Sequence, residues 1–155
     1  MKKSIVLAVF LLFLPGVAFC AGSYTAVSCD YGNSSGLKVC TTTLTADAAD
    51  ASFPAVPIVG PGGYITNVCI SEGSTATDGT ITVALTRTDT NINYLGSQGT
   101  NVTTGGASGY ACMKPYDWKN ESYSAGQSGN LTLQITGGGV NSANPLVVIT
   151  IDPAR

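Results

Sequence analysis

The densest group of side chains able to do chemistry lies between residues 110 and 123, in the stretch YACMKPYDWKNESY. Aromatic rings supply flat apolar area and neighbouring polar groups fix orientation, a combination that suits sugar or peptide recognition. The candidate ligand-binding residues are therefore Tyr110, Tyr116, Trp118, Asn120 and Tyr123. The structural alternative is that these rings close one end of the fold or pack on a disulfide at Cys112, because a lone tryptophan is usually largely buried.

The same stretch holds a pair of carboxylates, Asp117 and Glu121, that could serve a small hydrolase. Glycoside hydrolysis needs two carboxyl groups a few ångströms apart across the substrate, and four residues of loop do not define that distance. The chain contains no histidine, which excludes the usual Ser-His-Asp, Cys-His and zinc-histidine sites. G-x-S-x-G, phosphate-loop and dinucleotide motifs are also absent from the sequence. We expect no enzyme activity and no cofactor, with the carboxylate pair as a secondary alternative.

A possible metal site is suggested only by residues 89–93 (DTNIN), where oxygen-bearing side chains alternate as at the start of a calcium loop. The sixth position, where such a loop needs glycine, is Tyr94, and the twelfth, where it needs glutamate, is Thr100. The sequence has no CxxC pair either. We therefore predict no metal site.

The first twenty residues predict export. Lys2 and Lys3 precede an apolar run over residues 5–14, which is shorter than the roughly 20 residues that span a bilayer. Small residues then allow cleavage of a signal peptide after Cys20 or after Ala18. Phe19 argues against a bacterial lipoprotein, in which a small residue precedes the acylated cysteine. We predict a signal peptide over residues 1–20, a single mature domain over residues 21–155, and a periplasmic, extracellular or cell-surface location in a bacterium.

The remaining cysteines predict two disulfides, because an even number in an exported chain usually pairs completely. Three pairings are open in principle. Cys29 and Cys40 flank GNSSG at residues 32–36, and a hairpin about this turn would place them opposite each other. This favours Cys29–Cys40 and leaves Cys69–Cys112 as the second bridge.

Charge is sparse, which limits the classes of partner. The chain has 7 Lys and Arg against 9 Asp and Glu, and loss of Lys2 and Lys3 leaves 5 against 9, a net charge of −4. No basic patch is visible, so nucleic acid and anionic membranes are poor partners. No second long apolar run follows the leader, and no membrane span is expected in the mature chain.

The hydrophobic pattern has a period of two almost throughout, as expected for strands. Strands are predicted over residues 24–31, 37–45, 64–71, 80–91, 131–136 and 146–152, the fourth being the longest and the last lying centrally in a sheet. In the fourth, Ile81, Val83 and Leu85 face one side and the threonines the other. A helical turn capped by Thr45 is expected over residues 45–52, an extended connector over 53–63, and a long polar loop over 96–109.

These features predict an all-β antiparallel sandwich of about seven strands, for which a jelly roll is one arrangement. No family resemblance is evident. The first functional hypothesis is a non-catalytic protein that self-assembles or binds a surface partner, such as a fibre, coat or adhesion-type subunit. The second is a glycan-binding module that uses the aromatic segment.

Overall fold

The computed structural model describes residues 22–31, 36–104, 109–115, 125–127 and 129–153. The expected leader with Cys20, and the aromatic segment from residue 116 to 124, lie outside these ranges. The described residues form eleven strands and one 3-10 helix, and no helix among them is long and apolar enough to cross a membrane. The elements are β1 (Ser23–Tyr24), β2 (Ser28–Tyr31), β3 (Lys38–Thr45), β4 (Val56–Ile58), β5 (Gly63–Ser71), β6 (Thr80–Arg87), η1 (Gly96–Gly99), β7 (Val102–Thr103), β8 (Tyr110–Met113), β9 (Ala125–Gln127), β10 (Leu131–Gly137) and β11 (Leu146–Asp152).

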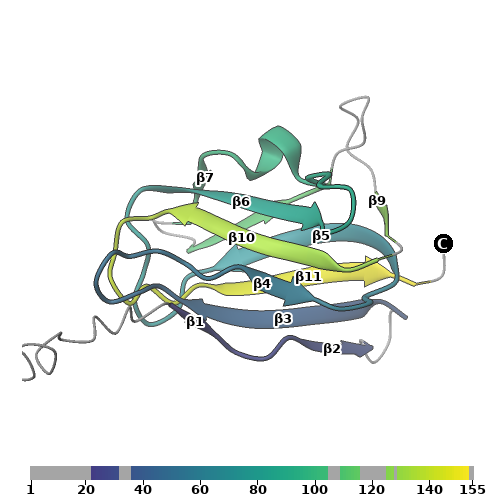
Figure 1. Cartoon of the computed structure of the whole chain (residues 1–155), viewed down its shortest axis with the longest axis horizontal. Coiled ribbons are helices and arrows are strands. Elements are labelled where there is room, and N and C mark those ends of the chain that lie inside the picture. The colour runs from purple at the N-terminus through teal and green to yellow at the C-terminus, as the bar shows by residue number, and fades with distance from the viewer. Residues whose placement is uncertain (1–21, 32–35, 105–108, 116–124, 128, 154–155) are drawn as a thin grey trace, which may run out of the picture.

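Two antiparallel sheets pack face to face, which confirms the predicted sandwich (Figure 1). The larger sheet has the order β1-β3-β11-β5-β8, with β2 added beside β3 and β9 beside β5. The smaller sheet has the order β4-β10-β6-β7. As predicted, β11 lies in the centre of its sheet, between β3 and β5.

The strand pairs are nested along the chain, which makes the sandwich a jelly roll. β6 pairs with β7, β5 with β8 and β9, β4 with β10, and β3 with β11. The chain therefore resembles one long antiparallel hairpin whose turn lies between β6 and β7. The hairpin is rolled up, so that the strand pairs along it alternate between the two sheets. Two four-stranded sheets, β3-β11-β5-β8 and β4-β10-β6-β7, are the result, and this is the jelly-roll arrangement.

The core forms where the apolar positions of both sheets meet. Alternation along each strand turns every second side chain inward, and the inward residues are almost completely inaccessible to solvent. Ile81, Val83 and Leu85 are at most 1% exposed, as their alternation with threonine predicts. The largest fully buried side chains are Leu44, Ile58, Ile65, Ile70, Ile81, Leu85, Leu95, Leu131, Leu133, Ile135, Ile149 and Ile151.

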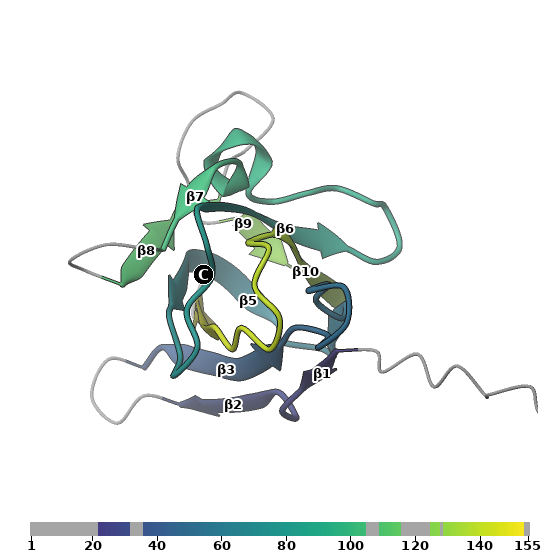
Figure 2. The ribbon, with the colours of Figure 1, turned by 90° about the vertical axis from the view of Figure 1, so that its left-hand side faces the viewer.

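Both outer edges of the larger sheet are strands broken in two. The predicted strand over residues 24–31 is interrupted where the Thr25 hydroxyl accepts a hydrogen bond from Thr43 N, so that β1 and β2 follow each other along β3 (Figure 2). At the opposite edge, β8 pairs with Val68–Ser71 and β9 with Gly63–Ile65 of the same strand β5. The register of β5 with β11 shifts at Thr66, whose hydroxyl donates to Thr150 O.

Two expected segments differ from the structure. The strand over residues 80–91 ends at Arg87, because residues 88–90 form a turn that places Asn91 at a φ of 56°. β5, and not β6, is therefore the longest strand. The expected polar loop over residues 96–109 contains η1 and β7, which buried Leu95 and Val102 fasten to the core. Gly99 packs so closely on β6 that an added Cβ would collide with Val83 O.

The turn expected over residues 45–52 exists, but its cap is Asp47 and not Thr45. Thr45 is still paired with Ser23 in the sheet. Asp47 is buried, its carboxylate accepts a hydrogen bond from Ala49 N, and its carbonyl accepts one from Ala51 N at 3.1 Å. The following connector contains only the three-residue edge strand β4, in agreement with its prolines.

Candidate functional site

Of the five predicted ligand-binding residues, the structure describes Tyr110 alone. Its side chain is 54% exposed at the start of β8, opposite Ser71 of β5. Tyr116, Trp118, Asn120 and Tyr123 lie outside the described residues, as do Asp117 and Glu121. The residues that flank this segment are paired with the same strand, Met113 opposite Val68 and Ala125 opposite Ile65.

The four cysteines of the described ranges form the two bridges favoured by the sequence. Cys29 lies opposite Cys40, and Cys69 opposite Cys112, so each disulfide joins directly paired residues. Each bridge fastens one edge of the larger sheet to the strand inside it. These four thiols are therefore unavailable as nucleophiles or metal ligands. Because disulfides persist in oxidising surroundings, the fold is consistent with an extracytoplasmic location.

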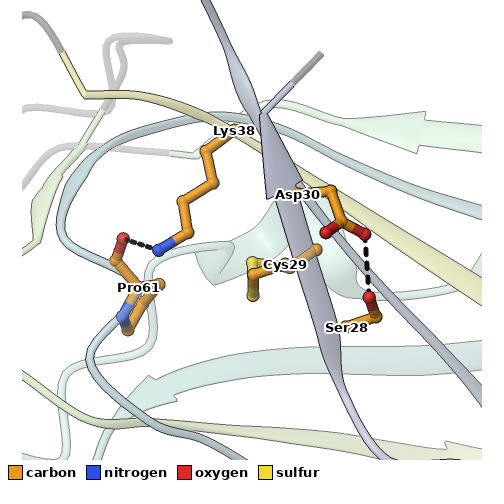
Figure 3. The surroundings of a disulfide bond; sticks show 6 residues. Ser28, Cys29, Asp30, Lys38 and Pro61 are labelled. Atoms are coloured by element: carbon orange, nitrogen blue, oxygen red, sulfur yellow. Dashed lines mark hydrogen bonds between the residues drawn. A yellow bond between two sulfur atoms is a disulfide. The ribbon is translucent and has the colours of Figure 1, made fainter.

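The Cys29–Cys40 bridge lies among polar groups that are paired with each other (Figure 3). Lys38 Nζ donates to the carbonyl oxygen of Pro61 at 3.0 Å, which ties the start of β3 to the loop after β4. The Ser28 hydroxyl donates to the Asp30 carboxylate at 2.9 Å on the exposed edge strand. Of these interactions, the Lys38 bond alone reaches the connection between the two sheets, while the Ser28–Asp30 bond lies within β2.

The outer surface of the smaller sheet is an uncharged layer that we call the threonine face. Cross-strand partners on it include Thr82 with Thr136 and Thr86 with Thr132. Its members are half-buried or exposed, and none carries a charge. They are Thr80, Thr82, Ala84, Thr86, Thr103, Thr132, Gln134 and Thr136.

The outer surface of the larger sheet is also uncharged around its centre. Tyr110 and Leu146, which is 36% exposed, both lie opposite Ser71 and so fall in one row across the sheet. Thr43 continues this row on the other side of Leu146. The charged residues of the described chain lie instead at strand ends, in turns or on the edge strand β2: Asp30, Lys38, Asp47, Asp50, Glu72, Asp78, Arg87, Asp89, Lys114 and Asp152.

The oxygen-rich turn at residues 89–93 uses its groups internally. Arg87 Nε lies 2.6 Å from the Asp89 carboxylate, and hydrogen bonding from Arg87 lowers the pKa of Asp89 from its ordinary value of 3.8. The Asn93 side-chain oxygen accepts hydrogen bonds from Leu85 N and Leu95 N. Across the described residues, no three His, Cys, Asp or Glu side chains gather as metal ligands would. The turn is therefore organised as a hairpin connection.

A pocket that the sequence did not reveal opens between the turn before β4 and the end of β10. It measures about 370 Å³ and is open to solvent on one side. We call it the Asp50 pocket. Its lining combines a carboxylate, hydroxyls, an amide, an aromatic ring and bare backbone, contributed by Asp50, Ala51, Ser52, Phe53, Gln134, Ile135, Thr136, Gly137 and Gly139.

Sequence reasoning missed this pocket because its two walls are far apart in the chain. Asp50 and Ser52 belong to a short alanine-rich turn, and Gln134 is one polar residue of an alternating strand. The only local signal is the run Gly137–Gly139, in which all three glycines have positive φ. Such a run permits close approach of the backbone to another group, but it does not identify that group.

The fold and these surfaces define a disulfide-bonded jelly-roll sandwich. No protein-family model matches the chain, and no curated protein matches it. Among solved structures, it is similar to a chain of the "Cyanophage Pam1 capsid asymmetric unit", with 16% sequence identity and a TM-score of 0.39. The similarity covers 81% of this chain and 91% of that one. Function must therefore be argued from the molecule's own surfaces.

Proposed function

We propose that the chain is an exported, non-catalytic subunit that assembles with copies of itself through the threonine face. Export rests on the leader-like first twenty residues and on the two disulfides. The observation that carries assembly is the absence of charge from the threonine face. Charged side chains are depleted in the centres of protein interfaces, because burying them costs desolvation energy.

The composition of the face fits this role. Only 10% of the chain is charged, compared with about 25% in an ordinary soluble domain. Threonine presents a methyl group and a hydroxyl that both donates and accepts, so a layer of threonines can pair with an identical layer without unmatched charges. A two-fold contact uses the same patch on both subunits and meets this requirement.

The test introduces a charge at the centre of the face. Thr82→Lys should keep the protein monomeric, whereas the wild type should form oligomers or fibres as concentration rises. Sedimentation velocity and negative-stain electron microscopy of the oxidised, exported protein would measure this. The matched control is Thr90→Lys, which adds the same charge in an exposed turn away from the face. Wild-type protein that stays monomeric at every concentration, or equal effects of both variants, would contradict assembly through this face.

A second candidate function is glycan binding through the aromatic segment, and exposed Tyr110 is the observation that favours it. Glycan titration should then quench or shift the fluorescence of Trp118, and Tyr110→Ala should weaken the response. If Trp118 fluorescence does not change across a glycan array, this candidate fails.

A further inference from the structure

We propose that the Asp50 pocket binds one pyranose unit of an uncharged saccharide. The pocket opens at the β4 edge of the smaller sheet and shares Gln134 and Thr136 with the threonine face, so the proposal concerns the monomer, in which that face is uncovered. None of the residues that line the pocket belongs to the aromatic segment of residues 110–123. A volume of about 370 Å³ lies at the lower end of the roughly 300–1,000 Å³ of small-molecule sites.

One wall of the pocket is a turn that hydrogen bonds hold in shape. Asp47 N donates to Ser52 O at 2.8 Å and Ala51 N donates to Asp47 O at 3.1 Å, so the turn is closed at both ends. Ser52 N donates to the Asp50 carboxylate at 2.9 Å. The Asp50 carboxylate is therefore held by Ser52 at the solvent-exposed rim of the pocket. The wall is therefore formed before any ligand arrives, which reduces the entropy lost on binding.

The opposite wall is a strand edge that β4 leaves uncovered. Asn130 O accepts a hydrogen bond from Thr88 N, so the backbone groups of Asn130 point toward the β6 side of β10. Backbone N–H and C=O groups alternate in direction along a strand. The backbone groups of Leu131, Leu133 and Ile135 therefore point toward β4. β4 covers the first two and stops at Val56.

The uncovered group is the backbone of Ile135. The residue that would pair with it by extension of the register is Pro54, which has no N–H to donate. The Ile135 side chain is only 1% exposed, so what it presents to the pocket is its backbone. The pocket thus contains a main-chain acceptor, the Ile135 carbonyl, to which the residue opposite it in the register can donate no hydrogen bond.

The chemistry of the two walls selects the ligand class. A carboxylate accepts hydrogen bonds from neighbouring hydroxyls, the Gln134 amide both donates and accepts, and the ring of Phe53 adds apolar area for a sugar face. The hydroxyl and N–H of Ser52 lower the pKa of Asp50 from its ordinary value of 3.8, so the carboxylate is charged at neutral pH. Phosphates, sulfates and acidic sugars would be repelled. An uncharged polyhydroxylated ring satisfies the whole set.

The experiment is titration of the oxidised, ¹⁵N-labelled exported protein with glucose, galactose, mannose and N-acetylglucosamine, followed by amide chemical shifts. At least one sugar should shift the signals of Ser52, Gln134, Gly137 and Gly139, and glucuronate should not. Asp50→Asn should weaken binding about tenfold, as expected for loss of a hydrogen bond to a charged group. Gln134→Ala, an exposed change on the other wall, should also weaken it. Asp78→Asn removes the same charge from an exposed residue that does not line the pocket, keeps the backbone bond from Asp78 N to Gly138 O, and should leave affinity unchanged.

Three outcomes would overturn the proposal. The first is the absence of shifts with all four neutral sugars at tens of millimolar. The second is shifts confined to β8 and its neighbours, which would place recognition at the aromatic segment. The third is equal affinity of Asp50→Asn and Asp78→Asn together with unchanged binding by Gln134→Ala. The titration is done at a concentration at which sedimentation velocity shows monomer, so failure of sugar binding and failure of assembly are distinguishable.

Discussion

Thr77 and Thr104 form a polar contact inside an otherwise apolar region. Thr77 is 6% exposed and Thr104 1%, and their hydroxyl oxygens lie 2.6 Å apart. Thr77 precedes β6 and Thr104 follows β7, so the contact joins the open ends of the hairpin at which the chain reverses. Each hydroxyl depends on the other, because neither is accessible to water.

Removing one of these hydroxyls should cost more than removing both. Thr77→Val should lower the free energy of unfolding by about 1–3 kcal/mol, since it leaves the Thr104 hydroxyl buried without its partner. The double variant Thr77→Val, Thr104→Val should cost less than the sum of the single changes. Guanidinium unfolding would measure the cycle, with Thr103→Val on the exposed side of β7 as control. Additive losses would show that the two hydroxyls do not depend on each other.

The Arg87–Asp89 pair should contribute to stability in a defined pH range. The pKa of Asp89 is lowered in the folded state, so folding favours the ionised carboxylate. The contribution is therefore present above 3.8 and is lost as pH falls through the folded-state pKa. In urea unfolding between pH 6 and pH 2, Asp89→Asn should show a smaller loss of stability on acidification than the wild type. Asp78→Asn, which lacks this partner, is the comparison, and an identical acid dependence in both variants would refute the role of the pair.

Single residues were predictable where a local pattern fixed their surroundings. The Cys29–Cys40 bridge followed from two cysteines that flank a turn, and Cys69–Cys112 was the pair that remained. The burial of Ile81, Val83 and Leu85 followed from alternation. The Asp50 pocket was not predictable. It forms because the fold brings Gln134 of β10 beside the turn that contains Asp50, and no local pattern in the sequence shows that these two segments meet. The cap of the 47–51 turn was misplaced by two residues, since pairing with β1 keeps Thr45 in its strand.

At the level of elements, the larger sheet is clamped at both edges and the smaller sheet is not. The Cys29–Cys40 bridge holds β2 on β3, and the Cys69–Cys112 bridge holds β8 on β5. The sequence separations that they close differ, at 11 and 43 residues. The chain-entropy model assigns the longer loop the larger effect, because it restricts the unfolded chain more.

The two bridges should therefore contribute unequally to stability. The model gives about 2.8 kcal/mol for the shorter loop and about 4.0 kcal/mol for the longer one. Replacing both Cys69 and Cys112 by serine should lower the free energy of unfolding by about 1 kcal/mol more than replacing both Cys29 and Cys40. Paired guanidinium unfolding curves would check this. A larger loss for the Cys29, Cys40 variant would contradict the entropic account.

The long strands were predictable and the short ones were not. β3, β5, β10 and β11 lie close to their expected bounds, because each carries enough alternating residues to show a period of two. β7, β8 and β9 have two to four residues, too few for a pattern. They are strands because β5 and β6 offer them a partner edge, and that is a property of the fold.

For the whole molecule, the sequence predicted a sandwich but left its topology open. Alternation gives each strand an inner and an outer side, and many strand orders satisfy it equally. The nested pairing is fixed by contacts between strands that are distant in the sequence. One example is β11, which pairs with β3 on one side and with β5 on the other. This information lies in contacts between distant residues and has no local signature.

The mass of the exported protein tests the expected processing. Cleavage after Cys20 should give a chain that begins at Ala21, with four hydrogens fewer than the reduced form because of the two disulfides. Intact mass spectrometry with and without reductant would measure both quantities. A chain that begins at Phe19, or one that carries a lipid on Cys20, would show a different fate for this cysteine.

The position of β11 has a consequence for the order in which the molecule can form. β11 follows every other described strand along the chain, yet it occupies the middle of the larger sheet. Until it arrives, β3 and β5 lack the neighbour that joins them, and their apolar faces have no complete core to enter. A chain that is synthesised from its N-terminus therefore cannot complete the larger sheet until residues 146–152 are available, and before then the apolar sides of β3 and β5 are exposed to aggregation.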